Sequence, residues 1–157
     1  MEAAVTNPTR PSAGIDPAAR SRARRRALQA VYAWQISGNR IDAVIDQFRH
    51  EQDMQIADLE YFEDIVRGVA RCHAELDEAM TPYLDREAER VDPIERAMLR
   101  IAAYELRDRI DVPYRVVINE AVETTKRFGS EHGHTYVNGV LDKLAGVWRS
   151  AEYSSRG

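Results

Sequence analysis

Apolar residues recur at intervals of three and four along most of the chain, which is the spacing of one face of an α-helix. The first such stretch is marked by Ala27, Leu28, Ala30, Val31 and Trp34. Asp16 and Pro17 precede it as an N-cap and a proline at the first helical position, and Gly38 follows as a stop signal. The pattern therefore predicts a first helix over about 17–37, roughly 30 Å long at the usual rise per residue.

The same spacing predicts five further helices. They are expected around 41–48 and over about 58–80, 93–106, 114–128 and 133–149. Asp92, Pro93 and Glu95 open the fourth helix with a capping box in which aspartate is the cap. That helix is apolar around most of its circumference, which predicts a central buried position. No segment alternates with a period of two, so the sequence predicts an all-α fold.

The chain of 157 residues is expected to form one domain. Residues 1–15 are small, polar and without periodicity, which predicts a disordered N-terminal extension. The helical domain is expected over 16–150, followed by a flexible tail over 151–157. The single cysteine, Cys72, allows no intrachain disulfide, and no apolar run approaches the ~18 residues of a membrane span. These features are typical of a cytoplasmic protein that does not enter membranes.

Charge is distributed unevenly along the chain. Five arginines and no acid lie within seven residues, at Arg20, Arg22, Arg24, Arg25 and Arg26. Residues 1–36 carry a net charge of +4, whereas the whole chain carries −4, so the remainder is strongly acidic. Guanidinium groups pair bidentately with phosphate and stay charged at any working pH. The run therefore predicts a local nucleic-acid patch, with a solvated basic helix face as the alternative.

Signatures of catalysis are absent from the sequence, which has no Gly-rich phosphate loop and no nucleophile elbow. His132 and His134 beside Glu131 are too few ligands for a physiological metal site without a cysteine cluster. Cys72 and His73 are adjacent on a predicted helix and point about 100° apart, which argues against a catalytic dyad. An enzyme, a cofactor and a bound metal are therefore not expected.

Three tyrosines, Tyr32, Tyr83 and Tyr136, lie at or near helix ends or the basic segment. Aromatic faces stack on unpaired bases, which is how single-stranded RNA is usually recognised. Taken singly, each tyrosine is better explained as an amphipathic residue at the edge of the core. Together with the arginine run they favour RNA as the ligand.

Four blocks of the sequence resemble the NusB family of transcription antitermination factors. They are Arg22-Ala23-Arg24 with Leu28–Gln35, Met98–Leu106, Asp111–Pro113 leading into Val117–Glu123, and Tyr136–Asp142. The blocks occur in the family's order, which makes the resemblance specific. It implies a NusB-like fold of two three-helix bundles joined by the first helix.

The resemblance also implies a function that the pattern alone does not show. NusB proteins bind the boxA element of nascent ribosomal-operon RNA together with NusE, a small-subunit ribosomal protein, in an antitermination complex on RNA polymerase. By matching position, partner contacts would involve Tyr32 and Glu95. Two copies of the chain could also associate through this partner-binding surface, so a homodimer is a further possibility. The implied RNA-binding residues are Arg20, Arg22, Arg24, Arg25, Tyr83, His132 and Tyr136. Of these, His132 stands where relatives carry an acid, which could alter RNA affinity at this edge.

Two other interpretations are weighed against this one. The same helical fold serves as the N-terminal RNA-binding domain of some ribosomal-RNA cytosine methyltransferases. Those enzymes need a downstream Rossmann-like domain and reactive cysteines, and this sequence has a single cysteine. A helical adaptor whose arginines pair with an acidic protein surface is the other alternative, and the salt dependence of RNA binding separates it from an RNA-binding factor.

Overall fold

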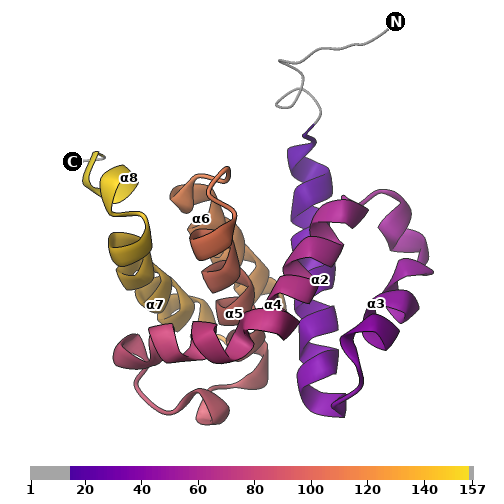
Figure 1. Cartoon of the computed structure of the whole chain (residues 1–157), viewed down its shortest axis with the longest axis horizontal. Helices are drawn as coiled ribbons and strands as arrows, with labels where there is room; N and C mark the ends of the chain where they lie inside the picture. Colours follow the sequence, from indigo (N-terminus) through magenta and orange to yellow (C-terminus); the bar gives the residue numbers. More distant parts are fainter. Residues whose placement is uncertain (1–14, 156–157) are drawn as a thin grey trace, which may run out of the picture.

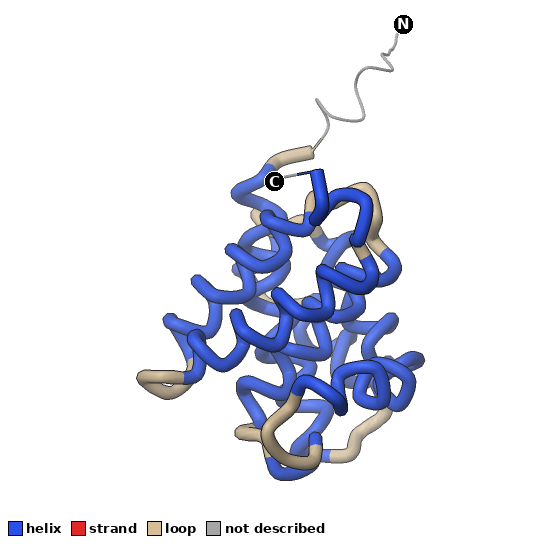
Figure 2. The backbone as a smooth tube through the Cα atoms, turned by 90° about the vertical axis from the view of Figure 1, so that its left-hand side faces the viewer, coloured by secondary structure: helices blue, strands red, loops and turns tan. Residues whose placement is uncertain are grey.

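The structure is a computed structural model that describes residues 15–155 and consists, over that range, of helices and loops without strands (Figure 2). The α-helices are α2 (Pro17–Ser37), α3 (Ile41–Arg49), α4 (Leu59–Met80), α5 (Pro93–Asp108), α6 (Tyr114–Phe128), α7 (Gly133–Trp148) and α8 (Ser150–Ser155). Three short 3-10 turns, η1 (Gln52–Gln55), η2 (Thr81–Tyr83) and η3 (Ala88–Arg90), lie between α3 and α5. The predicted all-α class is confirmed. The disorder expected for residues 1–15 falls, apart from Ile15, outside the described residues.

Local start and stop signals set the ends of the principal helices. The Asp16 carboxylate accepts a hydrogen bond from the Ala18 amide and caps α2, which ends where Gly38 adopts a left-handed φ of 73°. Asp92 accepts from the amides of Ile94 and Glu95 at the start of α5. These aspartates satisfy amide groups that the helix itself leaves without partners, so both predicted caps are confirmed.

The helices form two bundles that meet along α2, α4 and α5. In Figure 1, α3 lies on one side of α2, and α5, α6 and α7 lie on the other. Helices α2, α3 and α4 contact one another, as do α5, α6 and α7, while α2 and α4 both pack on α5. The expected pair of three-helix bundles is therefore observed, with the first helix joining them and α4 sharing that role.

Helix α5 is the centre of the core, as its apolar circumference predicts. An uninterrupted run from Ala97 to Leu106 is buried, and Ile101 is 0 % exposed. The run includes two charged side chains, Arg100 and Glu105, each of which has a charged partner on another helix. A helix buried on all faces needs such partners because an unpaired interior charge is costly.

The C-terminal segment differs from the expected flexible tail over 151–157. It is helical through Ser155, and its side chains close the ends of two neighbouring helices. The buried guanidinium of Arg149 donates to backbone carbonyl oxygens at the end of α5, and the Glu152 carboxylate accepts from the Tyr114 amide at the start of α6. Each charge lies at the helix end whose dipole favours it, so both contacts favour the helical conformation through Ser155.

Candidate nucleic-acid interface

The five arginines of the basic run do not form one patch, because each residue of a helix is rotated about 100° from the last. Arg20 and Arg24 are four residues apart and share one face of α2. Arg22, Arg25 and Arg26 are three and four apart and share another. The two sets meet different surroundings in the fold. Arg20 and Arg24 border a cleft that also contains the carboxylates of Asp111 and Glu120, whereas Arg22, Arg25 and Arg26 line a second cleft whose charged residues are all arginines.

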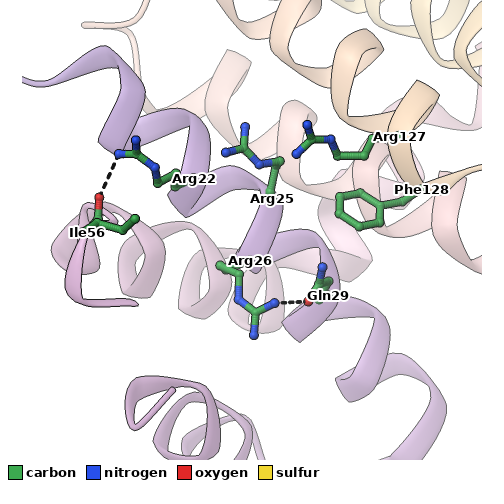
Figure 3. Close-up of a pocket in the computed structure, with 7 residues that line it drawn as sticks. All are labelled: Arg22, Arg25, Arg26, Gln29, Ile56, Arg127 and Phe128. Carbon is green, nitrogen blue, oxygen red and sulfur yellow. Dashed lines mark hydrogen bonds between the residues drawn. The ribbon is translucent and has the colours of Figure 1, made fainter. Parts of the chain in front are cut away.

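This cleft lies between α2 and the end of α6 and has a volume of about 310 Å³. Its lining residues are Arg22, Arg25, Arg26, Gln29, Ile56, Arg127 and Phe128. Figure 3 shows the guanidinium groups of Arg25 and Arg127 lying next to each other, with the Phe128 ring close to Arg127. Helix α6 therefore brings a fourth arginine and an aromatic ring to the basic face of α2. We call this set the arginine cleft.

Two of the four arginines in the arginine cleft are held by neighbouring groups. The Arg22 guanidinium donates to the Ile56 carbonyl oxygen over 3.1 Å. Arg26 donates to Gln29, pairs with Glu51 and stacks its guanidinium over the Phe48 ring. These contacts fix the positions of two positive charges at the edges of the cleft.

The other two arginines lie close together without such contacts. Neither Arg25 nor Arg127 makes a hydrogen bond or an ion pair within the described part of the chain. Burial and then the positive charge of Arg127 lower the pKa of Arg25 below its usual range. The Glu120 carboxylate acts on Arg25 in the opposite sense and only partly offsets these effects. Two like charges close together beside an open cleft form a site that an anion stabilises.

Arg24 is withdrawn from the surface, contrary to its expected role in RNA binding. It is 3 % exposed, and its Nε donates to both carboxylate oxygens of Glu105 on α5. Burial alone would lower the pKa of Arg24, but the Glu105 charge outweighs it and the pKa is raised. The Tyr61 hydroxyl donates to the same carboxylate, so the three side chains tie α2 to α4 and α5. Arg24 is therefore a structural residue in this chain.

Arg20 is likewise engaged, although less deeply. Its Nε donates to Asp58 over 3.3 Å, and its guanidinium lies 4.1 Å from the centre of the Tyr61 ring. Asp111 is a further charged neighbour at 3.9 Å. Binding a phosphate here would compete with these carboxylates, so Arg20 is a weaker candidate than Arg22 or Arg25.

The remaining predicted RNA contacts lie near the start of α7 and the segment before α5. The Tyr136 hydroxyl accepts a hydrogen bond from the Asp85 amide, and Arg86 lies over the Tyr136 ring at 5.7 Å. Tyr83, two residues before Asp85, is half-buried. His132 is exposed at the N-cap of α7. The structure thus brings Tyr83 and Tyr136 to one region, with His132 one turn before Tyr136.

The two predicted partner contacts differ in accessibility. Tyr32 is 37 % exposed on α2, whereas Glu95 is 8 % exposed. The predicted capping box is only half formed, because Asp92 caps the helix while the Glu95 carboxylate accepts from Ser130 Oγ instead. Glu95 is therefore directed into the protein.

Sequence reasoning missed Arg127, Phe128 and Ile56. Arg127 ends α6 beside Lys126, where basic residues are common because they complement the helix dipole, so nothing local marked it as a ligand-binding residue. Within residues 15–155 no cluster of three or more His, Cys, Asp or Glu could hold a metal ion. Over the same range, every helix is too short or too polar to cross a membrane.

Comparison with known proteins gives consistent matches over most of the chain. The model of the NusB family matches residues 21–146. The transcription antitermination protein NusB of Xanthomonas axonopodis pv. citri is 69% identical over 144 residues, covering 92% of this chain and 91% of that protein. The corresponding protein of Xanthomonas oryzae pv. oryzae is 71% identical over 139 residues, covering 88% of this chain and 89% of its own length.

Solved structures share the fold at lower sequence identity. T. maritima NusB superposes with a TM-score of 0.73 at 26% identity, covering 85% of this chain and 96% of that one. A chain from the crystal structure of antitermination factors NusB and NusE in complex with dsRNA gives a TM-score of 0.70 at 24% identity, covering 88% and 98%.

Proposed function

The chain belongs to the NusB family of transcription antitermination proteins, and from this membership we propose that its arginine cleft binds single-stranded boxA RNA of ribosomal RNA operons. In this proposal the chain acts together with the ribosomal protein NusE, within an antitermination complex on RNA polymerase. The single observation that carries it is the pair of close guanidinium groups of Arg25 and Arg127 beside an open cleft, neither of which has a hydrogen-bond or ion-pair partner among residues 15–155.

The arginine cleft has the features that a single strand requires. Arg25 and Arg127 have free donors for phosphate oxygens, and Arg22 adds a third positive charge that Ile56 holds in place. Phe128 offers an aromatic surface in the same cleft, on which an unpaired base can stack. Charge and stacking surface are thus combined in one cleft of about 310 Å³.

The RNA surface is proposed to extend towards the start of α7. His132 is exposed there, and the ring of Tyr136 is held by its bond to Asp85 with Arg86 above it. Tyr83 lies on the same segment as Asp85. His132 carries no negative charge, so it does not repel phosphate at this edge.

Tyr32 is the residue that we propose for contact with NusE, because it is exposed on the same helix as the arginine cleft. A homodimer that uses this surface would exclude NusE. We infer that the chain acts by binding and not by catalysis, since antitermination by this family is a matter of assembly on the polymerase. We also infer that it acts in the cytoplasm, where transcription takes place.

The test is a titration of the full chain with a short single-stranded boxA-like RNA, followed by fluorescence anisotropy, with a scrambled RNA as control. The titration is repeated with purified NusE and at several salt concentrations. We expect preference for the boxA-like RNA, tighter binding with NusE and a steep salt dependence. Equal binding of both RNAs, or none, would refute the proposal, and binding of NusE alone would favour a protein adaptor.

A further inference from the structure

Glu95 is a buried acidic residue at the third helical position of α5. An exposed acid at this position would only help to cap its own helix. It is 8 % exposed, and its Oε2 accepts a hydrogen bond from Ser130 Oγ over 2.9 Å. Ser130 belongs to the α6–α7 loop (residues 129–132), which is 35 positions away in sequence. The carboxylate of one helix is thus fixed to the loop between two others.

The start of α7 faces the same carboxylate. Gly133 is the first residue of α7, and a Cβ atom added there would lie 2.4 Å from Glu95 Oε2 and 2.9 Å from its Cδ. The N-cap residue, His132, makes no capping hydrogen bond through its side chain. Because the first amides of a helix favour a negative charge, Glu95 provides from α5 the anion that α7 lacks in its own sequence. The glycine leaves the space that this approach requires.

The α6–α7 loop that Glu95 holds connects the parts of the proposed RNA surface. Arg127 and Phe128 lie immediately before it and line the arginine cleft. His132 is its last residue and is exposed. Tyr136 follows one turn later on α7 and bonds to Asp85. A shift of the loop would therefore move the two sides of the RNA surface relative to each other.

We propose that Glu95 is a positioning residue for RNA binding, which acts by fixing the α6–α7 loop through Ser130 and the start of α7. The inference rests on the proposed RNA-binding function. The contact with Ser130 uses Oε2 alone, so the expected contact of Glu95 with NusE stays a separate prediction. A buried carboxylate gives up a hydrogen-bond partner only at a considerable cost.

The experiment compares four variants of the full chain with the wild type in the RNA titration. Glu95→Ala removes the carboxylate that accepts the hydrogen bond. Ser130→Ala removes the hydroxyl group that donates it, at a residue that is exposed. The third variant combines both changes. Glu95→Gln is the conservative variant, because its amide oxygen can still accept from Ser130 while the charge is gone. All are measured where thermal unfolding shows every variant to be folded.

We expect Glu95→Ala to weaken RNA binding by roughly fivefold to twentyfold, and Ser130→Ala by about threefold to tenfold. The double variant should be no weaker than Glu95→Ala, because both changes break one contact. Glu95→Gln should recover binding to within about threefold of the wild type. Amide hydrogen exchange in the α6–α7 loop should rise in the alanine variants.

Two results would overturn the inference. They are wild-type RNA affinity in Glu95→Ala and additive losses in the double variant. Failure of the wild type to bind RNA at all would overturn the proposed function as well. That failure appears before any variant is compared, so the two are distinguishable.

Discussion

Replacement of Arg25 and Arg127 by glutamine tests the arginine cleft most directly. The double variant removes the two guanidinium groups of the arginine cleft that have no hydrogen-bond or ion-pair partner within residues 15–155. Glutamine keeps much of the side-chain length and some hydrogen-bonding capacity, so that the main change is the loss of two positive charges. RNA binding should therefore weaken without any change in the helices.

The magnitude follows from counterion release on a single strand. Each phosphate contact contributes about −0.7 to the slope of log K against log salt, so the slope should become shallower by roughly 1.4. If the two proteins bind equally at 1 M salt, the same coefficient predicts that the double variant binds RNA about 25-fold more weakly than the wild type at 0.1 M salt. The two proteins should bind almost equally as the salt concentration approaches 1 M.

Stability should respond in the opposite sense from RNA affinity. Burial and the charge of Arg127 lower the pKa of Arg25, which means that the folded protein holds this cation at a cost. Removing both charges relieves that cost, so the melting temperature of the double variant should equal or exceed that of the wild type. A residue that weakens the fold and strengthens the complex is expected at a binding site.

The matched control is Arg40→Gln. Arg40 lies at the start of α3, its side chain is 88% exposed, and it does not line the cleft. This variant should leave the salt slope unchanged. An unchanged slope in the Arg25 and Arg127 double variant, or an equal change in the Arg40 control, would refute the assignment of the cleft.

Three further predictions concern the core and are tested by denaturation of folded protein. Ile101→Ala should destabilise the fold by about 2–5 kcal/mol because it leaves a cavity at a fully buried site. Asp92→Ala should cost about 1 kcal/mol through the lost helix cap. A lower urea midpoint for Asp92→Ala than for Ile101→Ala would contradict the central position of α5. Arg24→Ala should cost about 3–5 kcal/mol because it leaves the Glu105 carboxylate buried without its cation, and a loss of RNA affinity without destabilisation would show instead that Arg24 reaches RNA. Burial and the Glu105 charge raise the pKa of Tyr61 above its usual value of 10.0, so the unfolded chain releases this proton first and stability should fall as pH rises above that value. Tyr61→Phe should flatten this alkaline decline in a series of melting temperatures against pH, and an equally steep decline would exclude Tyr61 as its source.

Local signals in the sequence were sufficient for most of the fold. The predicted helix over 114–128 coincides with α6, and the predicted start near 58 and end at 80 agree with α4. Caps and glycine stops act through hydrogen bonds and backbone angles within a few residues, so they can be predicted from the sequence without the tertiary structure. The C-terminal helix α8 was missed because its contacts are distant in sequence: Glu152 of α8 accepts from the start of α6, and Arg149, just before α8, donates to the end of α5.

The candidate site was only partly predictable for the same reason. Helical rotation alone separates Arg20 and Arg24 from the other arginines, but it does not say which face is buried. That choice depends on Glu105, which is 81 positions away from Arg24 and offers a buried carboxylate to it. Likewise, Glu95 has the sequence position of a capping residue, and its turn towards Ser130 follows from the packing of α6 and α7 on α5.

The sequence by itself therefore determined the all-α class, the helix ends, the buried face of α5 and the presence of a basic segment on the first helix. The tertiary structure alone decided which arginines remain available to a ligand and added Arg127 and Phe128 to them. The physical reason is range. Periodicity and capping depend on neighbours along one helix. The set of charged side chains that line a cleft depends on residues that only folding brings together.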